Sequence, residues 1–163
     1  MMVAMQRVML DSNVVDKLLA DEDLLASILA AVAAGRLGIV VTHVQRDELA
    51  AVSAGERRMR LLEVLERVAP ASVATAGFVL DLSRLDHARL FDDDAASRHR
   101  GFVGRSRRRA KDALILATAE AEGLPVVTCE SKARNLRRFR TWFPAVNMLG
   151  LEDLRELARG SQT

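Results

Sequence analysis

The chain has 163 residues, of which 50% are hydrophobic and 28% charged, and its formal net charge is +2. This composition is typical of one globular domain and argues against a disordered chain. One cysteine, Cys129, excludes an internal disulfide, and with only three histidines beside it a Cys/His zinc site is implausible. The longest apolar stretch, residues 24–34, is too short to cross a bilayer, which takes about 20 apolar residues, so we expect a cytoplasmic protein.

Short apolar runs alternate with helical patterns along the chain. Strands are predicted at residues 7–10, 37–41, 124–128 and 146–149, with a fifth, shorter one at 72–75. Helices are predicted to begin at Asn13 and at Thr42, whose spacing to Gln45 is that of a capping box, and to occupy residues 21–34, 56–68, 77–90, 111–122, 130–140 and 151–158. Residues 92–109 are expected to be a loop or a mobile segment.

This alternation predicts an α/β domain with a mostly parallel central sheet of four to five strands and helices on both faces. Residues 1–158 are expected to form the single domain, and residues 159–163 a short flexible tail. Ligands of such folds bind at the carboxyl ends of the strands.

Basic residues concentrate in the second half of the chain. Residues 1–94 carry 10 basic and 15 acidic side chains, whereas residues 95–163 carry 14 basic and 7 acidic ones. The basic excess lies at 98–109 and 132–140, and it consists mostly of arginine. Arginine presents a planar fork of donors to phosphate oxygens, although such a cluster taken alone is more often a solvated face.

Four acidic residues stand at strand ends or near helix starts. Asp11 directly follows the first strand, and Glu130 lies two residues beyond the strand at 124–128. Glu48 stands two turns into the helix opened by Thr42, and Asp112 is expected in the first turn of its helix. Four carboxylates at one rim would repel one another unless a cation lay among them, and hard oxygen ligands select Mg²⁺ or Mn²⁺. Next to arginines, such a site suits phosphodiester hydrolysis.

Each acid also has a purely structural interpretation. Asp11 is as well suited to cap a helix as to catalyse, and Glu48 alone is better explained as an exposed helix residue. Asp112 and Glu130 would be favourable charges near a helix N-terminus. The catalytic interpretation therefore depends on the four residues together.

Three sequence blocks resemble the PIN-domain family, which includes the toxin ribonucleases of bacterial toxin–antitoxin pairs. The blocks are VMLDSNVVDKLL (8–19), VVTHVQRDELAAV (40–52) and KDALILATAEAEGLPVVTCESKARNLRRF (111–139). Their order and spacing agree with the family pattern of a strand with Asp-x-Asn, a helix carrying Glu, and a helix starting with Asp-Ala that leads to a strand and Thr-x-acid.

The resemblance implies a three-layer α/β/α PIN-like domain and assigns roles to individual residues. Asp11, Glu48, Asp112 and Glu130 match the four family acids, where the family more often has Asp at the fourth position. Asn13 and Thr128 match accessory polar positions. We regard five arginines as candidates for contacts to RNA phosphates: Arg107, Arg108, Arg109, Arg134 and Arg137.

The implied activity is that of a metal-dependent endoribonuclease. Asp11, Glu48 and Asp112 would hold one Mg²⁺ or Mn²⁺, and Glu130 would assist a second ion or the attacking water, leaving a 5′-phosphate and a 3′-hydroxyl. The partners implied are an RNA substrate, an antitoxin protein and a second copy of the chain. The apolar residues of the helices at 21–34 and 56–68 suit a dimer or antitoxin groove, and core packing explains them equally well.

Three other functions are weighed against this one. A non-catalytic RNA-binding or regulatory module on the same fold ranks second, because all four acids are present. A phosphatase of the haloacid-dehalogenase type would need a second Asp where the chain has Asn13. A receiver domain would need an Asp after a middle strand, where Val41 is followed by Thr42.

Overall fold

The computed structural model describes residues 5–79 and 82–160. Its elements, in chain order, are β1 (Gln6–Leu10), α1 (Ser12–Ala20), α2 (Glu22–Ala33), β2 (Leu37–Thr42), α3 (His43–Ala50), α4 (Gly55–Val68), β3 (Ser72–Val73), the 3₁₀ turn η1 (Leu85–His87), α5 (Asp93–Val103), α6 (Arg107–Glu122), β4 (Val126–Val127), α7 (Ala133–Trp142), β5 (Met148–Leu149) and α8 (Leu151–Arg159). No helix in these ranges is long and apolar enough to span a membrane.

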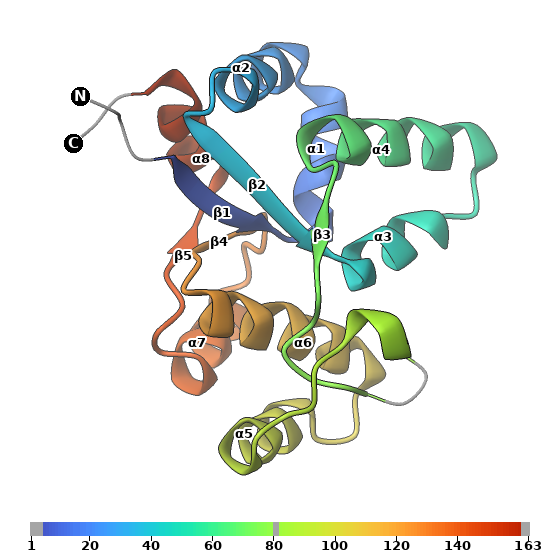
Figure 1. Ribbon diagram of the computed structural model, residues 1–163, viewed down its shortest axis with the longest axis vertical. Coiled ribbons are helices and arrows are strands. Elements are labelled where there is room, and N and C mark those ends of the chain that lie inside the picture. The colour runs from blue at the N-terminus through green and yellow to red at the C-terminus, as the bar shows by residue number, and fades with distance from the viewer. Residues whose placement is uncertain (1–4, 80–81, 161–163) are drawn as a thin grey trace.

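The five strands form one sheet in the order β3-β2-β1-β4-β5, and every pair is parallel. The chain builds the sheet outward from β1 to β2 and β3, then returns to the other side of β1 with β4 and β5 (Figure 1). The order therefore reverses between β1 and β4, and the crevice at the carboxyl ends of these two strands is the expected ligand site of such a sheet.

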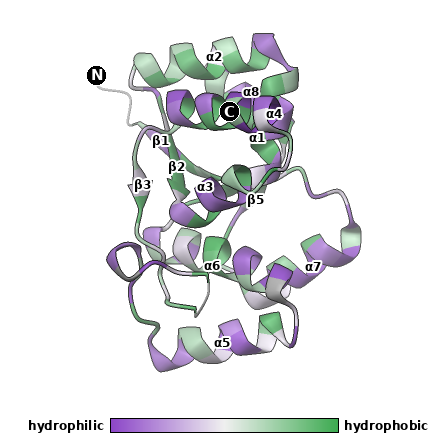
Figure 2. Ribbon diagram, turned by 90° about the vertical axis from the view of Figure 1, so that its right-hand side faces the viewer, coloured by the Kyte–Doolittle hydropathy of each residue, from purple (hydrophilic) through white to green (hydrophobic). Residues whose placement is uncertain are grey.

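Side chains of β1 alternate between two apolar cores. Val8 and Leu10 join the core under α1, α2, α4 and α8, whereas Met9 faces the core formed with α5, α6 and α7. Figure 1 shows these two sets of helices on opposite sides of the sheet. In Figure 2 much of α2 is hydrophobic, whereas much of α7 is hydrophilic. This arrangement confirms the predicted three-layer α/β/α architecture.

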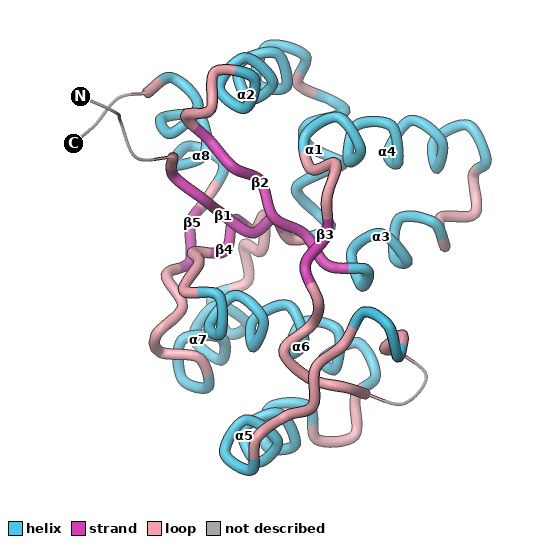
Figure 3. Tube along the Cα trace, in the orientation of Figure 1, coloured by secondary structure: helices cyan, strands magenta, loops and turns pink. Residues whose placement is uncertain are grey.

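The helix predicted at residues 77–90 is wrong. Thr75 instead pairs with a returning extended segment: its N–H donates to the carbonyl of His87 at 2.9 Å, and its carbonyl accepts from Arg89 at 2.8 Å. Among the described residues of this stretch, only the short turn η1 is helical, and Figure 3 draws most of the segment between β3 and α5 as loop. Leu80 and Asp81 lie outside the described residues. Strand-like pairing thus overrides the apolar spacing of this stretch.

The loop expected at residues 92–109 is also wrong, because most of it is α5. Asp92 caps this helix by accepting a hydrogen bond from the Ala95 N–H at 2.7 Å. The ring of Phe102 is fully buried against Phe139 and Phe143, with centroids 5.9 and 5.5 Å away. The i, i+4, i+7 spacing of Ala95, His99 and Phe102 indicates a helix with one inward face. The indication is weak because Phe102 is the single large apolar side chain among the three.

Helix starts differ from the predictions at two places that bear on the site. Helix α1 begins at Ser12, so its N-cap is Asp11 and not Asn13. Helix α6 begins at Arg107, so Asp112 lies in its second turn and not in the first. The capping box of Thr42 and Gln45 is confirmed. Helix α8 extends to Arg159, and residues 161–163 of the predicted tail lie outside the described residues.

Candidate active site

The four predicted acids converge at the carboxyl edge of the sheet. Asp11 follows β1, and Glu130 follows β4, its neighbour in the sheet. Glu48 comes from α3 and Asp112 from α6, two helices that contact each other. The carboxyl of Asp112 is close enough to Asp11, Glu48 and Glu130 to be repelled by all three. This is the crevice at which the strand order reverses.

Asp11 is tied to the neighbouring strand by Thr128, the residue that follows β4. Its carboxylate accepts no capping hydrogen bond from α1, and its Oδ2 accepts one from the hydroxyl of Thr128 at 2.8 Å. The same hydroxyl accepts the Glu130 N–H at 3.1 Å, and the side-chain amide oxygen Oδ1 of Asn13 accepts the Cys129 N–H at 3.0 Å. The accessory positions Thr128 and Asn13 therefore tie the ends of β1 and β4 together. Burial raises the pKa of Asp11 despite the bond from Thr128.

Asp112 is a second acid of the site whose charge is unfavourable in the absence of a cation. Burial raises the pKa of its carboxyl to about 7, and repulsion by Asp11, Glu48 and Glu130 contributes in the same direction. Asp11 and Asp112 line one small pocket with the Thr128 side chain and with apolar residues of α6, β4, β5 and α7. Desolvated carboxylates that repel one another are the electrostatic setting in which a divalent cation is bound.

Glu48 reaches the site from α3, and contacts from two other helices hold it. Its Oε2 accepts a hydrogen bond from the Ser12 hydroxyl, and its Oε1 lies 3.2 Å from the Lys111 ammonium nitrogen. The side chain is 27% exposed, so it is half-buried and not the free surface glutamate of the structural interpretation.

Glu130 lies at the more solvated end of the site. Its Oε2 accepts a hydrogen bond from the Asn135 amide and its Oε1 one from the Lys132 N–H, both at 2.7 Å. These bonds, with that of Asn135 first, lower the pKa of Glu130, whereas burial raises that of Asp112. They also anchor the segment that leads into α7.

The four carboxylates are the ligand type that suits a hard divalent cation, although their oxygens do not all point to one position. Within residues 5–79 and 82–160, no group of three His, Cys, Asp or Glu side chains is placed to hold a metal as it stands. Glu48 and Glu130 are turned toward the partners just described. All four acids offer carboxylate oxygens, which Mg²⁺ and Mn²⁺ prefer.

The predicted arginines divide into several environments. Arg108 is exposed and lies near both Asp112 and Glu130, whose pKa values it lowers. Arg134 and Arg137 are exposed on α7, and Arg137 lines a shallow surface groove of that helix. Arg109 is half-buried near the start of α6, and the Arg107 side chain lies outside what the structure describes.

Some basic residues of the same runs have structural contacts instead. The Arg138 guanidinium donates to the carbonyl of Phe102 and stacks over its ring at 5.1 Å, and Arg98 pairs with Glu120 at 2.6 Å. Sequence reasoning missed Ser12, Lys111 and Asn135, which hold Glu48 and Glu130. Ser12 and Lys111 adjoin predicted acids in the chain, and this adjacency was the available signal.

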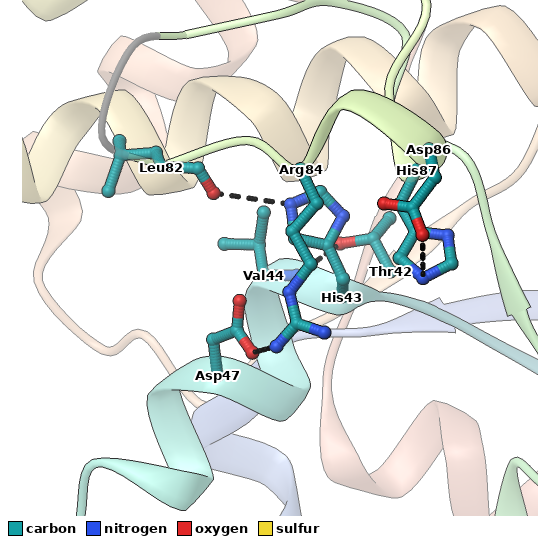
Figure 4. Close-up of polar contacts among 8 residues, drawn as sticks. All are labelled: Thr42, His43, Val44, Asp47, Leu82, Arg84, Asp86 and His87. Carbon is teal, nitrogen blue, oxygen red and sulfur yellow. Dashed lines mark hydrogen bonds and ion pairs between the residues drawn. The ribbon is translucent and has the colours of Figure 1, made fainter.

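A separate polar cluster fixes the start of α3, the helix that carries Glu48 (Figure 4). His43 is buried, as expected of a first-turn helix residue, and its Nε2 lies 3.2 Å from the Leu82 carbonyl. Its ring stacks on that of His87 with centroids 6.0 Å apart, and Arg84 pairs with Asp47 one turn along. The segment that replaced the predicted helix at 77–90 therefore braces α3 from outside.

Comparison with known proteins agrees with this fold. The PIN-domain family profile matches residues 8–139, so the chain belongs to the PIN-domain family. This confirms the resemblance seen in the sequence. No curated protein sequence matches the chain.

Two solved toxin–antitoxin structures are similar. One is VapBC2 from Rickettsia felis bound to a DNA fragment from its promoter, with 12% identity and a TM-score of 0.50 over 89% of this chain and 98% of that one. The other is VapBC-5 from Mycobacterium tuberculosis, with 20% identity and a TM-score of 0.44 over 88% and 98%. The likeness to VapBC2 concerns the fold.

Proposed function

We propose that this PIN-domain protein is a metal-dependent endoribonuclease that acts in the cytoplasm. The observation that carries the proposal is the convergence of Asp11, Glu48, Asp112 and Glu130 at the crevice where the strand order reverses. Membership of the PIN-domain family, whose members are generally nucleases, supports it.

Asp11, Glu48 and Asp112 would hold one Mg²⁺ or Mn²⁺, and Glu130 would assist a second ion or the attacking water. A bound ion would lower the pKa of water and neutralise charge on the scissile phosphate. Within the protein, Thr128 orients the Asp11 carboxylate, and Asn135 orients that of Glu130. Arg108 lies beside two of the acids, where an RNA phosphate would meet it, and Arg134 and Arg137 extend the basic surface along α7.

The test is cleavage of a mixed RNA pool by the purified chain with Mg²⁺, with Mn²⁺ and with EDTA. Asp11→Asn and Asp112→Asn are the test variants, and Asp16→Asn is the control because Asp16 is an exposed acid of α1 paired with Arg57. We expect metal-dependent cleavage that both test variants lose and the control keeps. Cleavage that survives EDTA or both substitutions would contradict the assignment. RNA binding without cleavage by the parent chain would support the non-catalytic module instead.

We further propose that the chain is the toxin of a type II toxin–antitoxin pair, and that it forms a homodimer. The fold likeness to the toxin–antitoxin structure VapBC2 supports an antitoxin partner. A groove between α2 and α4 offers a docking surface: Leu25, Ala26 and Leu29 line one side, and Arg60 and Arg67 the other.

The partner is expected to be a small protein encoded beside this one. Ala26→Arg would fill the groove at an exposed position of α2 and is expected to abolish co-purification with that protein. Ala30→Arg is the matched control, because Ala30 is also exposed on α2 but does not line the groove. Equal co-purification of both variants would show that the groove is not the docking surface.

A further inference from the structure

A lysine lies among the acids of the proposed active site and pairs with one of them. The Lys111 ammonium is 3.2 Å from Oε1 of Glu48, while the hydroxyl of Ser12 donates to Oε2 of the same carboxylate. Both oxygens of Glu48 are therefore occupied. The pair joins α6 to α3, and its side chains are only 33% and 27% exposed.

This pair is the only direct ionic contact made by any of the four acids within the described residues. Arg108 also affects Asp112 and Glu130, but its side chain is exposed and it forms no ion pair with them in the described structure. Among the side chains that the structure describes, one ammonium group thus forms the direct ion pair with this cluster of carboxylates that repel one another.

We propose that Lys111 is a built-in counter-ion of this site, which occupies Glu48 in the metal-free protein and is displaced when a divalent cation binds. The inference rests on the proposed function, since it concerns the same metal site. Glu48 must give up one of its two contacts to ligate an ion, and the ion supplies the positive charge that Lys111 provided. Lys111 is therefore a positioning residue that competes with the metal.

The residue type suits an exchangeable contact. The chain has 21 arginines and three lysines, yet a lysine stands here. An arginine would clamp a carboxylate with two parallel hydrogen bonds, whereas an ammonium is a compact, strongly hydrated charge on a flexible stem. Lysine thus balances the charge of the Glu48 carboxylate without holding the carboxylate in one fixed orientation.

The test is Mn²⁺ binding to the full chain, measured by isothermal titration calorimetry without RNA. Lys111→Gln removes the competing charge and is expected to tighten Mn²⁺ binding by about tenfold, because a unit charge a few Å from the ion no longer repels it. Lys111→Arg keeps the charge and clamps Glu48 more firmly, so its binding is expected to be weaker than that of the parent. Lys17→Gln is the control for net charge, since Lys17 is exposed on α1.

Thermal unfolding gives a second readout that does not depend on activity. Without metal, Lys111→Gln is expected to melt below the parent, because Glu48 has lost its counter-ion; with Mn²⁺ its upward shift is expected to exceed that of the parent. The inference would be overturned if Lys111→Gln bound Mn²⁺ no more tightly than the parent, or if Lys17→Gln tightened binding by the same factor. Either result would leave the proposed metal site itself uncontradicted. If the parent itself binds no Mn²⁺, the proposed metal site fails and the inference fails with it.

Discussion

Replacing Asp112 with asparagine is expected to stabilise the metal-free protein above neutral pH. Burial, and then repulsion by the neighbouring acids, raises the pKa of this carboxyl from 3.8 to about 7. Between these values the native chain retains a proton that the unfolded chain has released. Stability therefore falls as the pH rises through this window and stays low above it.

The magnitude follows from the shift. About three pKa units at about 1.36 kcal/mol each correspond to about 4 kcal/mol of unfavourable free energy for the ionised group. Asp112 is only partly buried, and the neighbouring acids share the repulsion, so we expect a gain of about 2 kcal/mol from removing the charge.

The assay is urea unfolding in EDTA at about pH 8 and about pH 5, where linkage predicts that the gain is larger at the higher pH. Asp16→Asn removes an exposed carboxylate from an ion pair and is expected to cost at most about 1 kcal/mol. In Mn²⁺ the order is expected to reverse, because the parent gains metal-binding energy that Asp112→Asn cannot. If Asp112→Asn is no more stable than the parent at either pH in EDTA, the carboxylates do not repel one another as argued.

Three further predictions concern residues around the site. Phe102→Ala is expected to cost about 3–5 kcal/mol in urea unfolding and to speed amide exchange along α5, because the ring is fully buried between α6 and α7; unchanged protection of α5 would contradict its packing. Thr128→Val removes the hydroxyl that donates to Asp11 and is expected to weaken Mn²⁺ binding about 10–100-fold in a calorimetric titration, and parental affinity would show that this bond does not position Asp11. Arg137→Ala is expected to reduce the slope of log affinity for RNA against log salt concentration by about one, the loss of one phosphate contact. Arg7→Ala serves as the control, because Arg7 is exposed near the opposite edge of the sheet. Equal slopes for both variants would show that Arg137 does not contact RNA.

Local patterns were sufficient to predict the sheet and most of its helices. Continuous apolar runs such as residues 37–41 are typical of strands buried on both faces, and the capping box of Thr42 and Gln45 fixes the start of α3 through contacts three residues apart. Because parallel strands end at one edge, the positions of Asp11 and Glu130 after their strands predicted that both lie there.

Local patterns failed where tertiary contacts decided the conformation. Residues 77–90 have helical apolar spacing, but Thr75 pairs with His87 and Arg89 in an extended arrangement. The opposite holds for α5, whose inner face relies on one large apolar side chain, Phe102, and becomes a helix because aromatic rings of α7 and the following loop enclose it.

The sequence by itself determined that Asp11 and Glu130 lie at the carboxyl edge of the sheet, because strand ends are local features. Only the tertiary structure decided what holds each carboxylate. The Ser12 hydroxyl reaches Glu48 across 36 residues, and that of Thr128 reaches Asp11 across 117. The first contact depends on the packing of α1 against α3, and the second on the reversal of strand order that places β4 beside β1. No local pattern in the chain encodes those distances.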